Sequence, residues 1–106
     1  MDQNAEAGTA QPLRRKVQIT NPQGLHLRPM QAFVALALQF HSKVRVQRNE
    51  AEPVDGKSIM SLMLLGAEPG SELTVEVEGP DGPAALDALV DLLANLESRV
   101  DLTSPD

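Results

Sequence analysis

The stretch Asn21-Pro22-Gln23-Gly24-Leu25-His26-Leu27-Arg28-Pro29-Met30 marks the point where the residue pattern of the chain changes. Before it, apolar and polar residues alternate as in a strand, and after it apolar residues recur at helical spacing. Proline is tolerated in the first turn of a helix, because the amides there have no intrahelical partner. We therefore predict that a helix begins at Leu27, with His26 at its N-cap.

The start of this helix has the composition of an anion-binding site. With His26 at the N-cap, the backbone N–H groups of Leu27 and Arg28 lie at the positive end of the helix dipole and have no intrahelical acceptor. The Arg28 guanidinium adds a full charge, and Gly24 lets the backbone come close. An imidazole in such a place can accept a phosphoryl group and form a covalent intermediate. The competing interpretation is that His26 only caps a surface turn.

Two segments resemble the HPr family, the histidine-containing phosphocarriers of the bacterial phosphoenolpyruvate:sugar phosphotransferase system. Residues 24–29 resemble the Gly-Leu-His-x-Arg-Pro active-site signature, and residues 57–66 resemble the segment that holds the family's regulatory serine. The resemblance covers residues 15 to 97 or so. It implies that His26 accepts a phosphoryl group from phosphorylated enzyme I, that Arg28 stabilises it, and that enzyme IIA domains receive it. Such a protein carries a group and is an enzyme only by convention.

Ser58 lies where a short helix is expected to begin. Serine is a common N-cap residue, which is the simplest role for it. The resemblance implies a second role, phosphorylation by an ATP-dependent HPr kinase/phosphorylase. The helix should tolerate a phosphate there, because the phosphate meets the positive end of the dipole. We expect the effect to fall on docking, where added negative charge makes desolvation costly and repels acidic partner groups.

The short helix after Ser58 is apolar on every side. Because so short a helix has only one buried side, some of its apolar residues must face solvent. The simpler interpretation is that most of them belong to the core. Exposed apolar clusters mark partner surfaces, and methionine suits a surface that meets several partners. We predict a partner surface that consists of Leu27, Met30, Ile59, Met60 and Met63. Leu27 and Met30 belong to it because the family has smaller residues at both positions.

Length and composition limit the other possibilities. The chain has 106 residues, enough for one domain, and a formal net charge of −6 that argues against a nucleic-acid partner. It has no cysteine, and its two histidines, His26 and His41, are fifteen positions apart in the sequence with no carboxylate cluster nearby. We therefore expect no metal site and no cofactor. No apolar run reaches the length of about 18 residues that a membrane span needs. We expect a monomeric, cytoplasmic protein without membrane insertion.

The remaining pattern predicts one α+β domain over residues 14–100. Residues 1–13 are small, polar and aperiodic, and we predict a disordered N-terminal extension there, with a C-terminal tail over residues 101–106. Strands are expected over 16–20, 43–48, 51–54 and 72–78, and helices over 27–39, 58–66 and 81–97. The order β-α-β-β-α-β-α predicts a two-layer open-faced sandwich, in which three helices cover one face of a four-stranded antiparallel sheet.

Two features predict the order of the strands. Pro53 cannot donate to a ladder, so the third strand should lie at an edge. The acidic fourth strand, with Glu76 and Glu78, fits best between the basic first and second strands, although a solvated face of mixed charge explains the same residues.

By pattern alone, a ferredoxin-like fold that hosts a small-molecule regulatory domain also fits. Within the phosphocarrier interpretation, the alternative is a paralogue that uses the relay only to regulate nitrogen or carbon metabolism.

Overall fold

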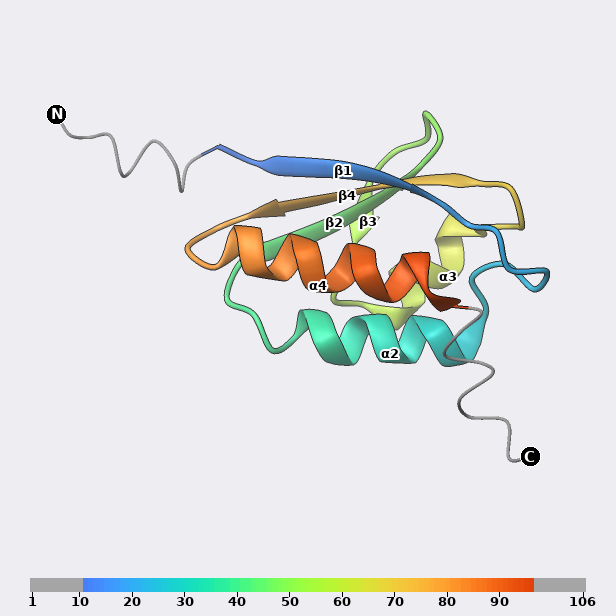
Figure 1. Ribbon diagram of the computed structural model, residues 1–106, viewed down its shortest axis with the longest axis horizontal. Coiled ribbons are helices and arrows are strands. Elements are labelled where there is room, and N and C mark those ends of the chain that lie inside the picture. Colours follow the sequence, from blue (N-terminus) through green and yellow to red (C-terminus); the bar gives the residue numbers. More distant parts are fainter. Residues whose placement is uncertain (1–10, 97–106) are drawn as a thin grey trace, which may run out of the picture.

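A computed structural model describes residues 11–96 of the chain, and Figure 1 shows the arrangement of its elements. Within these residues, one antiparallel sheet has the order β1-β4-β2-β3, with β1 (Leu13–Gln18), β2 (Lys43–Arg48), β3 (Val54–Asp55) and β4 (Glu72–Glu78). The helices α2 (Leu27–Ala37), α3 (Ile59–Leu65) and α4 (Gly82–Ala94) cover one face of it. The predicted two-layer open-faced sandwich is confirmed.

Several boundaries differ from the prediction. β1 begins at Leu13, inside the expected extension, where Leu13 pairs with Val77 and its side chain packs beside Gly82 at the start of α4. Residues 1–10 of that extension lie outside the described residues, as do the end of the predicted domain and the tail, residues 97–106. α2 ends at Ala37 and α4 at Ala94, both short of the predicted ends. Leu38, which lies inside the predicted helix 27–39, is the C-cap residue of α2 and is exposed.

The strand order agrees with the charge pattern. β4 lies between β1 and β2, where Glu76 is paired with Arg14 on one side and Arg45 on the other, and Glu78 is paired with Lys43. The Arg14 guanidinium lies 3.5 Å from the Glu76 carboxylate. Such exposed pairs are individually weak, but opposite charges across strands favour this register. The order excludes the ferredoxin-like alternative, in which the third strand, and not the fourth, lies between the first and the second.

β3 lies at the edge, as predicted from Pro53. Because Pro53 has no N–H, the ladder begins only after it, and β3 is limited to Val54 and Asp55 instead of the predicted 51–54. This short strand forms the edge of the sheet next to β2, and α3 packs against both β2 and β3.

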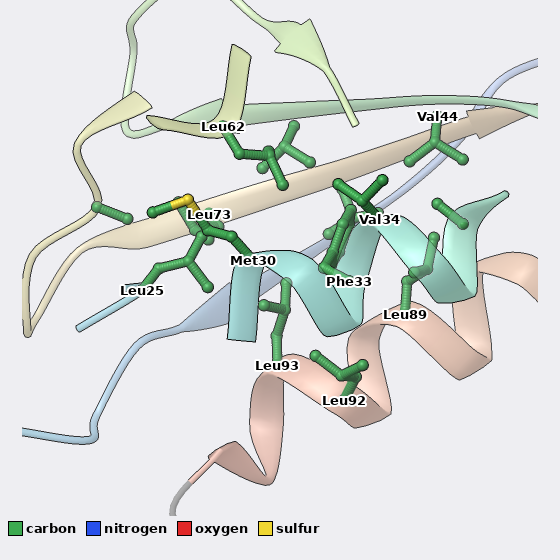
Figure 2. Packing of buried hydrophobic residues seen from close by; sticks show 14 of the residues in the cluster. Leu25, Met30, Phe33, Val34, Val44, Leu62, Leu73, Leu89, Leu92 and Leu93 are labelled. Carbon is green, nitrogen blue, oxygen red and sulfur yellow. The ribbon is translucent and has the colours of Figure 1, made fainter. Parts of the chain in front are cut away.

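The core fills the space between the sheet and the helices. Leu73, Val75 and Val77 of β4 alternate with polar residues and are fully buried. Figure 2 shows Phe33 and Val34 of α2, and Leu89 and Leu93 of α4, among the side chains that pack in this space. Full burial of each such side chain stabilises the fold by about 1.5–3 kcal/mol. α4 packs on β1 and β4, and α2 lies against α3 and α4.

A tight turn over residues 21–24 determines where α2 begins. The Gly24 N–H donates to the Asn21 carbonyl (3.1 Å), and the buried Asn21 Nδ2 donates to the Gly24 carbonyl (3.0 Å). Gly24 has φ +67°, and a Cβ on it would lie 2.8 Å from the Ala67 carbonyl oxygen. The Leu25 N–H donates to that same oxygen (3.0 Å). The turn is therefore fixed against the loop between α3 and β4.

Asp81 joins two loops at the other end of α2. Its carboxylate accepts hydrogen bonds from the Ser42 hydroxyl and from the backbone N–H groups of His41 (2.8 Å) and Ser42 (2.9 Å). The Ser42 hydroxyl, followed by the His41 N–H, lowers the pKa of Asp81 from 3.8 to about 2. Although Asp81 is the N-cap residue of α4, its side chain forms no capping hydrogen bond with that helix.

Gly24→Ala is expected to destabilise the protein by more than about 1 kcal/mol, because the positive φ and the nearby Ala67 carbonyl both disfavour a Cβ. Urea unfolding measures the change. Gly66→Ala is the matched control, since Gly66 has φ +65° but no atom within 4 Å of the added Cβ. Equal losses in the two variants would show that the close contact with Ala67 contributes nothing.

Asp81→Asn is expected to make stability less dependent on pH in the acid range. The pKa of Asp81 is lower in the folded protein (about 2) than its ordinary value of 3.8, so the ionised carboxylate stabilises the fold above about pH 4. That contribution is lost as the pH falls towards 2, and the difference between wild type and variant should shrink over this window. Urea unfolding at a series of pH values tests this.

Asp87→Asn is the control for this prediction, because it removes only the exposed contact between Asp87 and Arg15 (3.2 Å). It should change stability little. If the difference between wild type and Asp81→Asn stays constant from neutral pH down to about pH 2, the hydrogen bonds of Asp81 do not contribute as described.

Candidate functional site

α2 begins where the sequence predicts. His26 is its N-cap residue, with φ −103° and ψ −171°, and the Met30 N–H donates to the His26 carbonyl (3.0 Å) as the first hydrogen bond of the helix. Pro29 has no N–H, so Leu27 and Arg28 are the first-turn residues whose N–H groups have no intrahelical acceptor. These two amides, at the positive end of the helix dipole, directly follow His26 in the chain.

His26 is half-buried. Its side chain forms no capping hydrogen bond, so the interpretation of His26 as a side-chain cap is not supported. The Nε2 atom is shielded from solvent and has no hydrogen-bond partner in the described part of the chain. A reagent that arrives from solvent therefore does not reach Nε2. Arg28, two residues further on, is exposed.

Three of the five residues predicted for the partner surface are exposed. Leu27 is 52% exposed, and Met60 and Met63 on α3 are 76% and 56% exposed. Leu64, at 84%, is the most exposed large apolar residue in the described part of the chain, and the prediction omitted it. The helical period could have found it, because burial of Leu62 and Leu65 turns Leu64 towards solvent. Among the exposed large apolar side chains, Leu27 is next to His26 in the chain, and Met60, Met63 and Leu64 lie on α3. We call these four the exposed apolar residues.

The prediction that Met30 belongs to the partner surface is wrong. Met30 is only 8% exposed, and Figure 2 shows it in the core beside Leu25 and Leu73. Its place three and four residues before Phe33 and Val34 puts it on the buried stripe of α2. Ile59 is partly buried and packs against the core, so only part of its side chain is open to a partner.

Ser58 is the N-cap residue of α3, as expected. Its backbone is extended, with φ −128° and ψ 119°, and its Oγ accepts a hydrogen bond from the Ser61 N–H (3.1 Å). His41 is exposed in the loop after α2, and its N–H is held by Asp81. Over residues 11–96, no three histidine or carboxylate side chains come together as a possible metal site. No helix in the same range is long and apolar enough to cross a bilayer.

Comparisons with known proteins agree with this arrangement. The family model described as "PTS HPr component phosphorylation site" matches residues 13–95. The chain is similar to phosphocarrier protein HPr of Cupriavidus necator, with 46% identity over 83 residues that cover 78% of this chain and 92% of the relative. It is also similar to phosphocarrier protein HPr of Pseudomonas aeruginosa, with 44% identity over 80 residues, or 76% of this chain and 89% of that one.

The fold comparison points to the same group. The crystal structure of HPr-C-His from Thermoanaerobacter tengcongensis is similar with a TM-score of 0.74 and 37% sequence identity. The match covers 78% of this chain and 92% of that structure. Since the family model spans both the first turn of α2 and α3, the match includes the two segments singled out in the sequence. The chain belongs to the HPr family of phosphocarrier proteins of the phosphotransferase system.

Proposed function

We propose that this protein is a cytoplasmic phosphocarrier that accepts a phosphoryl group on His26 from phosphorylated enzyme I and passes it to enzyme IIA domains. The observation that carries the proposal is the position of His26 at the N-cap of α2, next to two amides without an intrahelical acceptor. Membership of the HPr family supports the choice of donor and acceptor. The relatives are phosphocarrier HPr proteins, which does not favour the regulatory-only alternative.

The burial of Nε2 supports Nδ1 as the accepting atom. In the transfer, the Nδ1 lone pair attacks phosphorus, the bond between phosphorus and the donor atom of enzyme I breaks, and an N–P bond forms. The N–H groups of Leu27 and Arg28 then donate to the phosphoryl oxygens, and the Arg28 guanidinium balances their charge. Both residues are exposed, so the phosphoryl group is stabilised without being enclosed.

The exposed apolar residues supply a docking surface suited to a carrier. Leu27 is next to His26 in the chain, and Met60, Met63 and Leu64 lie on α3, which packs against α2. A carrier has to bind its donor and its acceptors weakly and in turn, and flexible methionine side chains adapt to more than one partner. Ile59 contributes at most its exposed part.

Ser58 is the second modification site of the proposal, as a substrate of an HPr kinase/phosphorylase. Its Oγ already accepts a hydrogen bond from the Ser61 N–H, and phosphate oxygens are stronger acceptors for that role. α3 should therefore remain folded after phosphorylation. The phosphate would lie two residues before Met60, so its charge would weaken apolar docking next to it.

Incubation with enzyme I and labelled phosphoenolpyruvate should label the protein with acid-labile, alkali-stable phosphate. His26→Ala should abolish the label, whereas His41→Ala, the matched control in an exposed loop, should retain it. Arg28→Ala should slow transfer by about tenfold or more, because a hydrogen bond to a charged group contributes about 1.5–3 kcal/mol. Label that persists in His26→Ala would refute the site.

A purified HPr kinase/phosphorylase with ATP should label Ser58, and Ser58→Ala should lose the label. Ser61→Ala is the matched control, since Ser61 contributes its backbone N–H and not its side chain to the cap. The phosphorylated protein should then accept phosphoryl groups from enzyme I more slowly than the unmodified one. Undiminished kinase labelling of Ser58→Ala, or no labelling of the wild type, would remove this part of the proposal.

A further inference from the structure

We propose that Met60 and Met63 form a reversible oxidation site, at which peroxide weakens the docking of this protein to enzyme I. The inference rests on the proposed function, because its consequence is measured as a change in phosphoryl transfer. It goes further by assigning a modification, with hydrogen peroxide as the oxidant, to two side chains whose only proposed role so far is apolar contact.

The exposure of the three methionines within residues 11–96 separates them into two kinds. Met60 is 76% and Met63 56% exposed, whereas Met30 is 8% exposed. Met60 and Met63 are three residues apart on α3, a spacing that places both thioethers on the same side of the helix. Oxidation of sulfur side chains follows their access to solvent. Peroxide should therefore modify Met60 and Met63 well before Met30.

The reaction is balanced by the oxidant alone. A lone pair of the thioether sulfur attacks one oxygen of hydrogen peroxide, the O–O bond breaks, and the products are a sulfoxide and one water molecule. Sulfur loses two electrons and the peroxide gains them. Methionine sulfoxide reductases, with a thiol reductant, return the sulfoxide to the thioether, so the modification is reversible.

Oxidation at these positions should change the surface without unfolding the helix. The buried side of α3 consists of Leu62 and Leu65, and neither Met60 nor Met63 belongs to the core. A sulfoxide is polar, and its desolvation in an apolar contact is unfavourable when it finds no partner. The neighbouring Leu64 offers none. The chemistry at His26 does not involve α3 side chains, so the effect should be on KM for transfer from enzyme I and not on kcat.

The experiment treats the full chain with dilute hydrogen peroxide and maps sulfoxides by mass spectrometry of proteolytic peptides, with His26 checked for modification. Oxidation of Met60 and Met63 should be faster than that of Met30 by about tenfold or more. The oxidised protein should show KM for transfer from enzyme I raised by about tenfold, with unchanged far-ultraviolet circular dichroism. Treatment with reductases for both sulfoxide epimers should restore the original KM.

Variants separate this effect from general damage, with each variant compared before and after peroxide. Met60→Leu/Met63→Leu keeps apolar side chains of similar volume and should show no change in KM on peroxide treatment. Met30→Leu is the matched control and should keep the full sensitivity of the wild type. Met60→Gln/Met63→Gln places polar groups at both positions and should reproduce the raised KM without oxidant.

Two results would overturn the inference while leaving the proposed function intact. One is an unchanged KM in protein with sulfoxides confirmed at both Met60 and Met63. The other is an equal rise in KM in Met60→Leu/Met63→Leu, which would place the damage elsewhere. If the untreated protein accepts no phosphoryl group from enzyme I, the proposed function itself fails, and the inference about docking fails with it.

Discussion

The close approach of Gly24 to the Ala67 carbonyl is the contact on which the arrangement of the site depends. The carbonyl oxygen accepts the Leu25 N–H at 3.0 Å and would lie 2.8 Å from any Cβ on Gly24. The chain is thus held against the loop that follows α3 immediately before it enters α2. As a result, the first turn of α2 has a fixed start, and His26 becomes its N-cap residue. The same contact brings the end of α3 close to the residues that precede the histidine.

The local part of this arrangement was readable from the sequence. The start of α2, the N-cap position of His26, the cap at Ser58 and the edge position of β3 each depend on a few adjacent residues, such as Pro29 or Pro53, whose backbone chemistry allows few alternatives. The alternation in Leu73, Val75 and Val77 and the stripes of α2 and α4 determined the two layers. The position of β4 between β1 and β2 agrees with the opposite charges on the three strands.

What the sequence did not reveal depends on contacts between distant residues. Asp81 accepts hydrogen bonds from Ser42, 39 positions earlier, and no local pattern indicates such a pairing. The half-burial of His26 and the shielding of its Nε2 atom depend on how neighbouring elements pack. For Met30, the comparison with smaller residues in the family favoured the surface and the helical period favoured the core. The period was the better guide, because burial follows the face of the helix.

The central claim is that a phosphoryl group on His26 is held by the amides of the first turn of α2. Proton–nitrogen correlation spectra of the protein before and after phosphorylation by enzyme I test it most directly. The account predicts an N–P bond at Nδ1 of His26 and the largest downfield shifts at the Leu27 and Arg28 amide protons, because these donate to the phosphoryl oxygens. A phosphorylated His26 with both amides unshifted, or a phosphoryl group on Nε2, would contradict it.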